Sequence, residues 1–230
     1  MEQRAPETPV MENYEDEHRQ IEAYLQNEPC PRLHLGTGRV ALPGWLNSDS
    51  SPLHPDYLPI DAAEPLPLPN DSINAVFCEH LIEHLSFTAG TAMVAEVFRI
   101  LKPGGVIRVS TPDLQRLRGL IAKERNSVQN QYVRVVNSPF GENPYSNDPT
   151  FTLNSSFYNH GHRSLYTRGV LRQVFEKAGF ESLSWTTPLV SKHQMLTGLE
   201  HHGRLLGDER LNSIEHMVLE GSKPSVNERP

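Results

Sequence analysis

The stretch from Arg32 to Asp49 carries residue types that could hold a nucleoside. A short apolar strand there ends in the turn Gly36-Thr37-Gly38, and a second short strand around Trp45-Leu46 leads to Asp49. Because glycine has no Cβ atom, the backbone N–H groups of such a turn can come close to a ligand. A carboxylate at a strand end can accept hydrogen bonds from both hydroxyls of a ribose. The pairing predicts a nucleoside held between a glycine turn and an acid.

The same glycines also fit the fingerprint of nicotinamide-dependent oxidoreductases, because Gly36 to Ala41 reads G-x-G-x-x-A. That fingerprint needs a helix directly after the glycines and an acid about 20 residues further on. Pro43 and Gly44 leave no room for the helix, and Asp49 comes too early. The oxidoreductase therefore stays the less favoured alternative.

Two groups of histidines could suggest a metal site. His80 to His84 reads H-x-x-E-H, the pattern of inverted zinc proteases. That pattern requires both histidines on one helix face and a further ligand from elsewhere. His80 directly follows an apolar run of strand length, so we expect no metal here, and we expect His201-His202 at the surface. Cys30 and Cys78 have neither metal-like spacing nor the pattern of a disulfide framework.

Strands that alternate with helices must position these residues. Further strands are expected at Ile73–Cys78, Val106–Ser110, Phe180–Trp185 and His216–Glu220, with a short one ending at Ile60-Asp61. Helices are expected at Glu15–Gln26, Thr88–Leu101, Leu114–Arg125 and between the cap Thr167 and the stop Gly179. The alternation predicts an α/β fold with a doubly wound parallel sheet.

One long segment interrupts this alternation. Asn137–Phe157 is rich in Asn, Pro and Ser and is too long for an ordinary connection, so we expect a lid or substrate loop there. We divide the chain into residues 1–28, an acidic tail with a short helix, and residues 29–230, one domain with the substrate loop near 126–163. The first ten or so residues are expected to be a mobile tail.

Composition excludes several classes of protein. The 230 residues suit one domain, and 37% of them are hydrophobic. No apolar stretch is long enough to span a bilayer and the start does not read as a signal peptide, so we expect a cytoplasmic protein without a membrane partner. The net charge is -7, and no broad basic face suggests a nucleic-acid partner.

Taken in order, the residues resemble a class I S-adenosylmethionine-dependent methyltransferase of the type 11-like kind. The stretches that carry the resemblance are Leu33–Gly38, Gly44–Asp49, Leu66–Cys78, Glu79–Leu85, Leu101–Gly105 and Lys177–Phe180. Gly161–Tyr166 is further similar to a bacterial branch often associated with surface-polysaccharide and other biosynthetic clusters. The resemblance implies a Rossmann-like, doubly wound seven-stranded sheet with the last strand antiparallel. It also implies S-adenosylmethionine as cofactor and a small-molecule or saccharide acceptor methylated at oxygen.

The resemblance also implies which residues bind the cofactor: Gly36, Thr37, Gly38, Asp49, Asp61, Ala62 and Glu79. The Gly36–Gly38 turn would hold the methionine end, Asp49 the ribose hydroxyls, and Asp61 with Ala62 the adenine. The family often has an acid two residues before the first glycine, where this chain has His34. The family's usual third glycine is also replaced in this chain, near Val40. These two departures keep a non-catalytic S-adenosylmethionine-binding protein as an alternative.

Histidines are the candidate bases, since their ordinary pKa lies near neutrality. The sulfonium activates the methyl group, so the protein has to place the acceptor and, for a hydroxyl, remove its proton. We expect His160 and His162, which flank Gly161, to be the better candidates, with His80 at the edge of the methyl-transfer pocket and His84 also considered. The Asn159–Arg163 turn and the long segment before it should form the wall and lid of the acceptor pocket, with Arg163 facing an acidic group of the acceptor.

Overall fold

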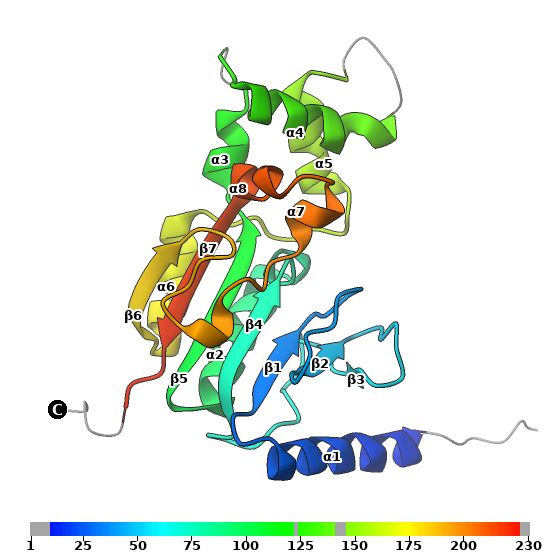
Figure 1. Ribbon diagram of the computed structural model, residues 1–230, viewed down its shortest axis with the longest axis vertical. Coiled ribbons are helices and arrows are strands. Elements are labelled where there is room, and N and C mark those ends of the chain that lie inside the picture. Colours follow the sequence, from blue (N-terminus) through cyan, green and yellow to red (C-terminus); the bar gives the residue numbers. More distant parts are fainter. Residues whose placement is uncertain (1–9, 122–123, 141–145, 226–230) are drawn as a thin grey trace, which may run out of the picture.

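A seven-stranded mixed sheet forms the centre of the computed structural model, which describes residues 10–121, 124–140 and 146–225 (Figure 1). The strands are β1 Arg32–Leu35, β2 Leu46–Asp49, β3 Leu58–Pro59, β4 Ile73–Glu79, β5 Leu101–Pro112, β6 Glu181–Thr186 and β7 His216–Ser222. Their order is β3-β2-β1-β4-β5-β7-β6. The first five pair in parallel, and β7 is antiparallel to β5 and β6. The predicted Rossmann-like sheet is confirmed.

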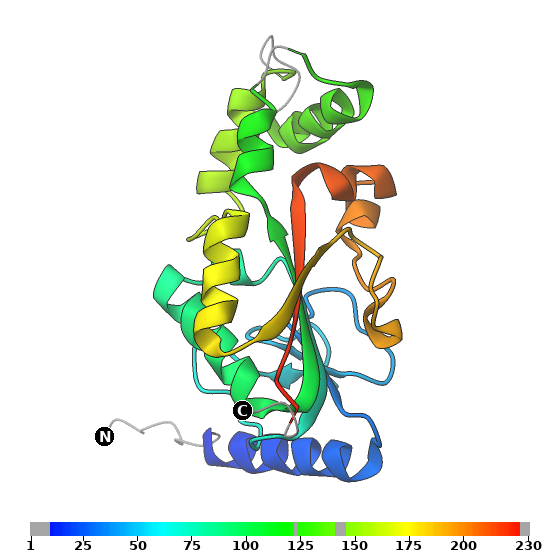
Figure 2. The same cartoon turned by 90° about the vertical axis from the view of Figure 1, so that its left-hand side faces the viewer.

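Helices and 3-10 turns cover this sheet. They are α1 Val10–Asn27, η1 Ile82–His84, α2 Phe87–Ile100, α3 Leu114–Gly119, α4 Ser127–Asn137, η2 Ser138–Phe140, α5 Pro149–Tyr158, α6 Arg168–Ala178, η3 Gln194–Leu196, α7 His202–Leu205, η4 Glu209–Leu211 and α8 Asn212–Glu215. Figure 2 shows α2 and α6 on one face of the sheet, and the segment with η3 and α7 on the other. Among the described residues, none of the helices has both the length and the apolar character needed to cross a membrane.

The helices form where the sequence provides caps and apolar stripes. In α2, the Ser86 side chain accepts a hydrogen bond from the backbone N–H of Ala89, and the buried residues of the helix face the sheet. In α6, Thr167 accepts from the N–H of Val170, and Gly179 ends the helix with a φ of 100°. Both helices confirm the prediction to within a residue or two. Helix α1 also forms, and it is longer than the predicted Glu15–Gln26.

Two predictions about the middle of the chain are wrong. The helix expected over Leu114–Arg125 ends at Gly119, and Asn137–Phe157 is not an irregular loop, because α5 occupies its second half. Asp148 caps α5 by accepting from the N–H of Thr150, and Pro149 stands at its first position, where proline is well tolerated. Helices α4 and α5 pack together beyond the end of β5 and form a small lobe at the top of Figure 1. The part of the expected loop at 141–145, like the expected tail at 1–9, lies outside the described residues.

Candidate active site

Three cavities meet at the carboxyl ends of β1, β2 and β4. The Asp49 cavity, of about 260 Å³, lies between Asp49 and Asp61. The glycine-turn cavity, of about 200 Å³, lies between the Gly36–Gly38 turn and α7. The histidine cavity, of about 480 Å³, lies between α4, α5 and the histidines at 80 and 162. This is the edge where open α/β sheets bind ligands.

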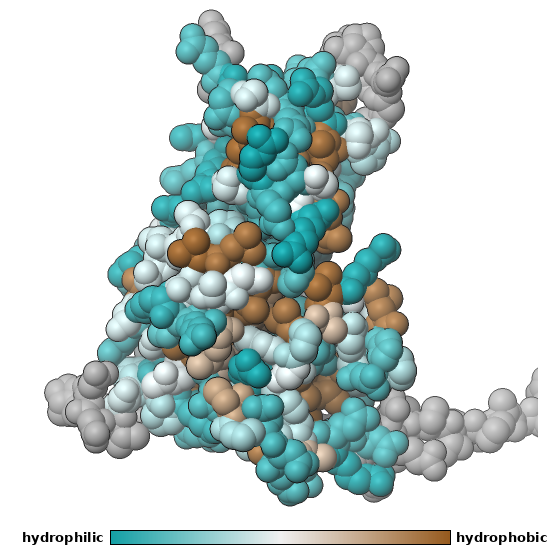
Figure 3. All heavy atoms as spheres, in the orientation of Figure 1, coloured by the Kyte–Doolittle hydropathy of each residue, from teal (hydrophilic) through white to brown (hydrophobic). Residues whose placement is uncertain are grey.

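Shared residues join the three cavities into one cleft. Gly36 lines both the Asp49 cavity and the glycine-turn cavity. His80 and His202 line both the glycine-turn cavity and the histidine cavity. His84 lines the Asp49 cavity and the histidine cavity. In Figure 3, apolar residues show around the middle of the molecule, where the upper helical lobe meets the sheet.

The glycine turn is held by β2. The N–H groups of Gly36 and Thr37 both donate to the Ser48 carbonyl, at 2.9 and 2.8 Å. Gly36 has a φ of 76°, and a Cβ atom there would lie 3.0 Å from Cδ1 of Leu81. Gly38 has a φ of 54°, and a Cβ atom there would meet nothing within 4 Å, so the open space beside it faces the cavity. Both glycines are therefore required, one by packing and conformation and the other by conformation alone.

Asp49 is held in place by two backbone donors. Its Oδ2 accepts from the N–H of Gly38 at 2.9 Å, and its Oδ1 accepts from the N–H of Ser51 at 3.0 Å. Each carboxylate oxygen has a further lone pair, so an oriented acceptor remains for a pair of hydroxyls. Asp61 and Ala62 line the same cavity, with Asp61 exposed and Ala62 buried. The predicted ribose and adenine residues thus lie together.

His34 and Glu79 line the glycine-turn cavity. His34 is buried, its Nδ1 lies 3.2 Å from Oδ1 of Asn47, and burial lowers its pKa to about 4. A neutral ring therefore stands where the family often has an acid. Glu79 accepts backbone hydrogen bonds from His201 at 2.9 Å and from His202 at 3.2 Å, which ties α7 to the end of β4.

The three histidines expected to be catalytic, His80, His160 and His162, all line the histidine cavity. Nδ1 of His162 lies 2.7 Å from the carbonyl oxygen of Ser156, which can only accept, so this nitrogen carries a hydrogen, and in the neutral ring the lone pair is on Nε2. His160 is exposed, with its Nε2 3.2 Å from Oγ of Ser155. Arg163, expected beside the acceptor, lines the Asp49 cavity instead.

A second set of residues meets His80 and was missed in the sequence. His80, with a φ of 50°, follows β4, while His202 begins α7 and the pair Glu215 and His216 joins α8 to β7. His202 Nε2 lies 3.0 Å from Oε1 of Glu215, and its ring stacks on that of His80 with centroids 4.0 Å apart. Nε2 of His80 contacts Nε2 of His216. His202 was expected at the surface, and its side chain is 22% exposed within this cluster.

The carboxylates of this region shift the pKa values of their neighbours. Burial by itself would lower the pKa of His80, but the charge and hydrogen bond of Glu83 outweigh it and raise that pKa to about 9. Burial would raise the pKa of Glu215, but His202 and the other imidazoles hold it well below its usual range. Burial, and then the charge of Glu215, raises the pKa of Tyr132. Glu215 is therefore an anion inside the protein.

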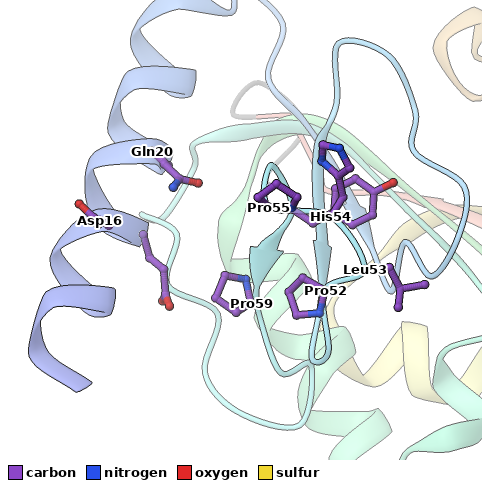
Figure 4. Close-up of a pocket in the computed structure, with 9 residues that line it drawn as sticks. Asp16, Gln20, Pro52, Leu53, His54, Pro55 and Pro59 are labelled. Carbon is purple, nitrogen blue, oxygen red and sulfur yellow. The ribbon is translucent and has the colours of Figure 1, made fainter. Parts of the chain in front are cut away.

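A fourth cavity, of about 490 Å³, lies apart from this cleft (Figure 4). It is bounded by Asp16 and Gln20 of α1, by the loop with Pro52 and Pro55, and by Pro59 of β3. Prolines lack the backbone N–H that orients a polar ligand, and this hollow shares no lining residue with the three joined cavities. We therefore place the functional site at the three joined cavities.

Comparison with known proteins identifies the family. A family model described as a methyltransferase domain matches residues 5–184. A probable S-adenosylmethionine-dependent methyltransferase from Mycolicibacterium smegmatis is 50% identical to this chain over 48 residues, which are 21% of this chain and 18% of that protein. The chain therefore aligns with less than a fifth of that relative's length.

Solved structures with a similar fold are distant in sequence. A possible exported protein from Bordetella parapertussis has a TM-score of 0.50 and 14% identity, with 94% of this chain and 70% of that chain covered. An S-adenosylmethionine-dependent methyltransferase from Archaeoglobus fulgidus has a TM-score of 0.49 and 16% identity, with 92% and 94% covered. At such identities the likeness concerns the fold alone.

Proposed function

The chain belongs to the family of class I S-adenosylmethionine-dependent methyltransferases, and we propose that it transfers a methyl group to an oxygen of a small-molecule or saccharide acceptor. The observation that carries this proposal is the joining of three cavities, since Gly36 links two of them and His80 with His202 links the third. A cofactor in the first two would direct its reactive end at an acceptor in the third. S-adenosylmethionine, when bound, supplies a methyl group already activated by the sulfonium.

Residues at the strand ends would hold the cofactor. Asp49 offers two oriented carboxylate oxygens to the ribose hydroxyls, and the exposed Asp61 lies beside the space for the adenine. The open Gly38 and the neutral His34 would line the methionine end. Glu79 already accepts two backbone hydrogen bonds, so its part would be to position α7 over the cofactor as well as to line the cavity.

The acceptor would lie in the histidine cavity. Tyr132, Val135 and Val136 of α4 and the end of α5 supply a mixed apolar and polar wall. His162 is the best base, because the Ser156 carbonyl fixes its proton on Nδ1 and leaves Nε2 free to accept. His160 sits at the exposed rim, where it would contact the acceptor from solvent. The surrounding helical lobe takes the place of the loop expected to form the lid.

A non-catalytic cofactor-binding protein is the second candidate, favoured by the departures at His34 and Val40. Such a protein would keep the Asp49 cavity and the glycine-turn cavity without turnover. A base with a fixed lone pair at the third cavity favours an enzyme. The cytoplasmic location inferred from the sequence stays a prediction.

Release of S-adenosylhomocysteine with a panel of sugars, nucleotide sugars, phenols and hydroxy acids tests the proposal. We expect turnover with at least one class and a fall of roughly 10²–10⁴-fold in kcat for His162→Ala, with cofactor affinity nearly unchanged. His54→Ala, a histidine on the exposed loop beside α1, serves as the matched control. Cofactor binding without turnover on any acceptor would favour the non-catalytic protein, and full activity of His162→Ala would exclude that residue as the base.

A further inference from the structure

Four side chains point their metal-binding atoms at one spot beside the acceptor space. They are His80, His202, Glu215 and His216, and each offers one ligand atom within 4.8 Å of all the others. Oε1 of Glu215 lies 3.0 Å from Nε2 of His202 and 3.6 Å from Nε2 of His216. The four come from β4, α7 and the junction of α8 with β7. Segments far apart in the chain thus converge on one small volume.

The outer nitrogens of two of these rings are already occupied. Nδ1 of His80 lies 2.7 Å from Oε1 of Glu83, and Nδ1 of His216 contacts Oδ1 of Asn212. Both partners are acceptors, so each Nδ1 carries a hydrogen, and a neutral ring then has a lone pair on Nε2. Nε2 of His80 and Nε2 of His216 are in contact, so a cation lies between them: a proton on His80 in the metal-free protein, which a metal ion could replace.

Further hydrogen bonds fix the carboxylates of Glu83 and Glu215 in place. The second oxygen of Glu83 accepts from the hydroxyl of Thr111 at 2.8 Å, and both side chains are buried. The buried hydroxyl of Tyr132 donates to Oε2 of Glu215 at 2.5 Å, which leaves Oε1 directed at the imidazoles. Proteins orient metal ligands in this way, with a carboxylate or other acceptor on the second nitrogen of a ligating histidine.

We propose that His80, His202, Glu215 and His216 bind one divalent transition-metal cation through the three Nε2 atoms and Oε1 of the glutamate. Three imidazoles with one carboxylate suit zinc and its neighbours in the first transition row. Magnesium and calcium prefer sites built from oxygen alone, so they are not the expected cations. The inverted zinc-protease pattern noted in the sequence thus gives one ligand, His80, while Glu83 of that pattern supports it.

The place of this site gives the cation a role that rests on the proposed function. His80, His202 and Glu215 line the histidine cavity, so a coordination position can open toward the acceptor. A cation there would bind an acceptor hydroxyl and lower its pKa. The hydroxyl proton would pass to Nε2 of His162, the oxygen electron pair would form the bond to the methyl carbon, and the departing sulfur would keep the electrons of the broken bond.

Metal binding by the full chain, purified without a histidine tag and stripped with chelator, tests the site. We expect zinc and cobalt(II) each to bind as one equivalent, with a visible cobalt spectrum typical of nitrogen and oxygen ligands. His202→Ala and Glu215→Gln should lose affinity by more than the ~10–100-fold typical of removing a supporting residue, and Asn212→Ala should fall within that range. His54→Ala should bind like the wild type.

Two further measurements make each outcome decisive. Circular dichroism establishes the fold of each variant, and the partly exposed His202 is the substitution best tolerated if Glu215→Gln does not fold. Calorimetry with S-adenosylhomocysteine on the metal-free protein tests the proposed function separately. A wild type that binds neither zinc nor cobalt overturns the metal site, even if it binds S-adenosylhomocysteine. Equal metal affinity in His202→Ala and the wild type overturns it as well.

Discussion

Two buried polar clusters in this protein are built from similar groups and differ in what neutralises them. In the first, the arginine cluster, Arg108 of β5 lies between Glu200 and Glu220. In the second, the histidine cluster, His80, His202 and His216 surround Glu215. Both clusters place carboxylates inside the protein, where removing an unpaired charge from water costs on the order of several kcal/mol.

The arginine cluster satisfies itself. Arg108 contacts Glu200 at 2.6 Å and Glu220 at 2.5 Å, and it donates further to the carbonyl oxygens of Val190 and Thr187. The second oxygen of Glu200 accepts from the N–H of Leu189 at 2.7 Å. The chain provides its own cation here, and the cluster fastens the segment after β6 to the sheet.

The histidine cluster consists of groups that can exchange a proton for a metal ion. Its supporting residues hold the outer nitrogens of two rings, so the inner nitrogens and one carboxylate oxygen face one another. Unlike the arginine cluster, it borders a cavity of about 480 Å³. A closed set of partners therefore indicates a structural role, while metal-ligating atoms that converge beside a cavity indicate a ligand site.

The largest expected effect tests the structural side of this comparison. Arg108→Met should leave two carboxylates buried without their cation, and the free energy of unfolding should fall by about 3–5 kcal/mol in urea denaturation. Adding Glu200→Gln and Glu220→Gln to this variant should recover part of the loss. A loss below about 1 kcal/mol for the single variant would show that the arginine cluster is not closed as described.

In the cofactor site, replacing Asp49 should weaken the binding of S-adenosylhomocysteine. Asp49→Ala removes an oriented acceptor for two hydroxyls, so the affinity for S-adenosylhomocysteine should fall by about 2–4 kcal/mol in titration calorimetry. Asp56→Ala, on the exposed loop before β3, is the matched control and should bind like the wild type. Unchanged binding by Asp49→Ala would remove Asp49 from the cofactor site.

An added cation should stabilise the protein through the histidine cluster and not through the arginine cluster. Zinc at 100 times its Kd should raise the free energy of unfolding of the wild type by about 2.7 kcal/mol, because it binds the folded state alone. The same addition should leave His202→Ala unchanged, although the arginine cluster is intact in both. Equal stabilisation of the two proteins would mean that zinc binds elsewhere.

The smallest effect concerns His34, a buried histidine whose ring lies against the side-chain amide of Asn47. Because its pKa is lowered to about 4, the folded state binds fewer protons than the unfolded state between that pH and the ordinary histidine value. Stability should therefore decrease as the pH falls, by about 2 kcal/mol from pH 7 to pH 5. His34→Asn, which can still pair with Asn47, should reduce this dependence by that amount. If the free energies of unfolding of the two proteins, measured with urea, fall by the same amount from pH 7 to pH 5, this prediction is wrong.

Local signals allowed most of the fold to be predicted. The cap at Thr167 and the stop at Gly179 define α6, and the glycine turn followed by Asp49 defines the ends of β1 and β2. The helix α5 was missed because its apolar pattern is weak and the surrounding Asn, Pro and Ser residues suggested a loop. Asp148 followed by Pro149 was the available signal, since an acid before proline is a common helix start.

The histidine cluster could not be predicted, because its members are distant in the sequence. His80 and His216 are 136 residues apart, and the antiparallel insertion of β7 beside β5 brings them together. No local pattern marks Glu215 or His202 as partners of His80. Only the pairing of the strands, together with the Glu79 contacts that hold α7, determines that these side chains meet.

A crystal structure with S-adenosylhomocysteine and zinc, measured on both sides of the zinc absorption edge, tests the cofactor site and the metal site together. We expect the ribose at Asp49, the sulfur near Gly36, and one anomalous peak among His80, His202, Glu215 and His216. An ordered cofactor in the cleft with no anomalous peak at those four side chains would contradict the metal site. S-adenosylhomocysteine bound away from the Gly36–Gly38 turn would contradict the cofactor site itself.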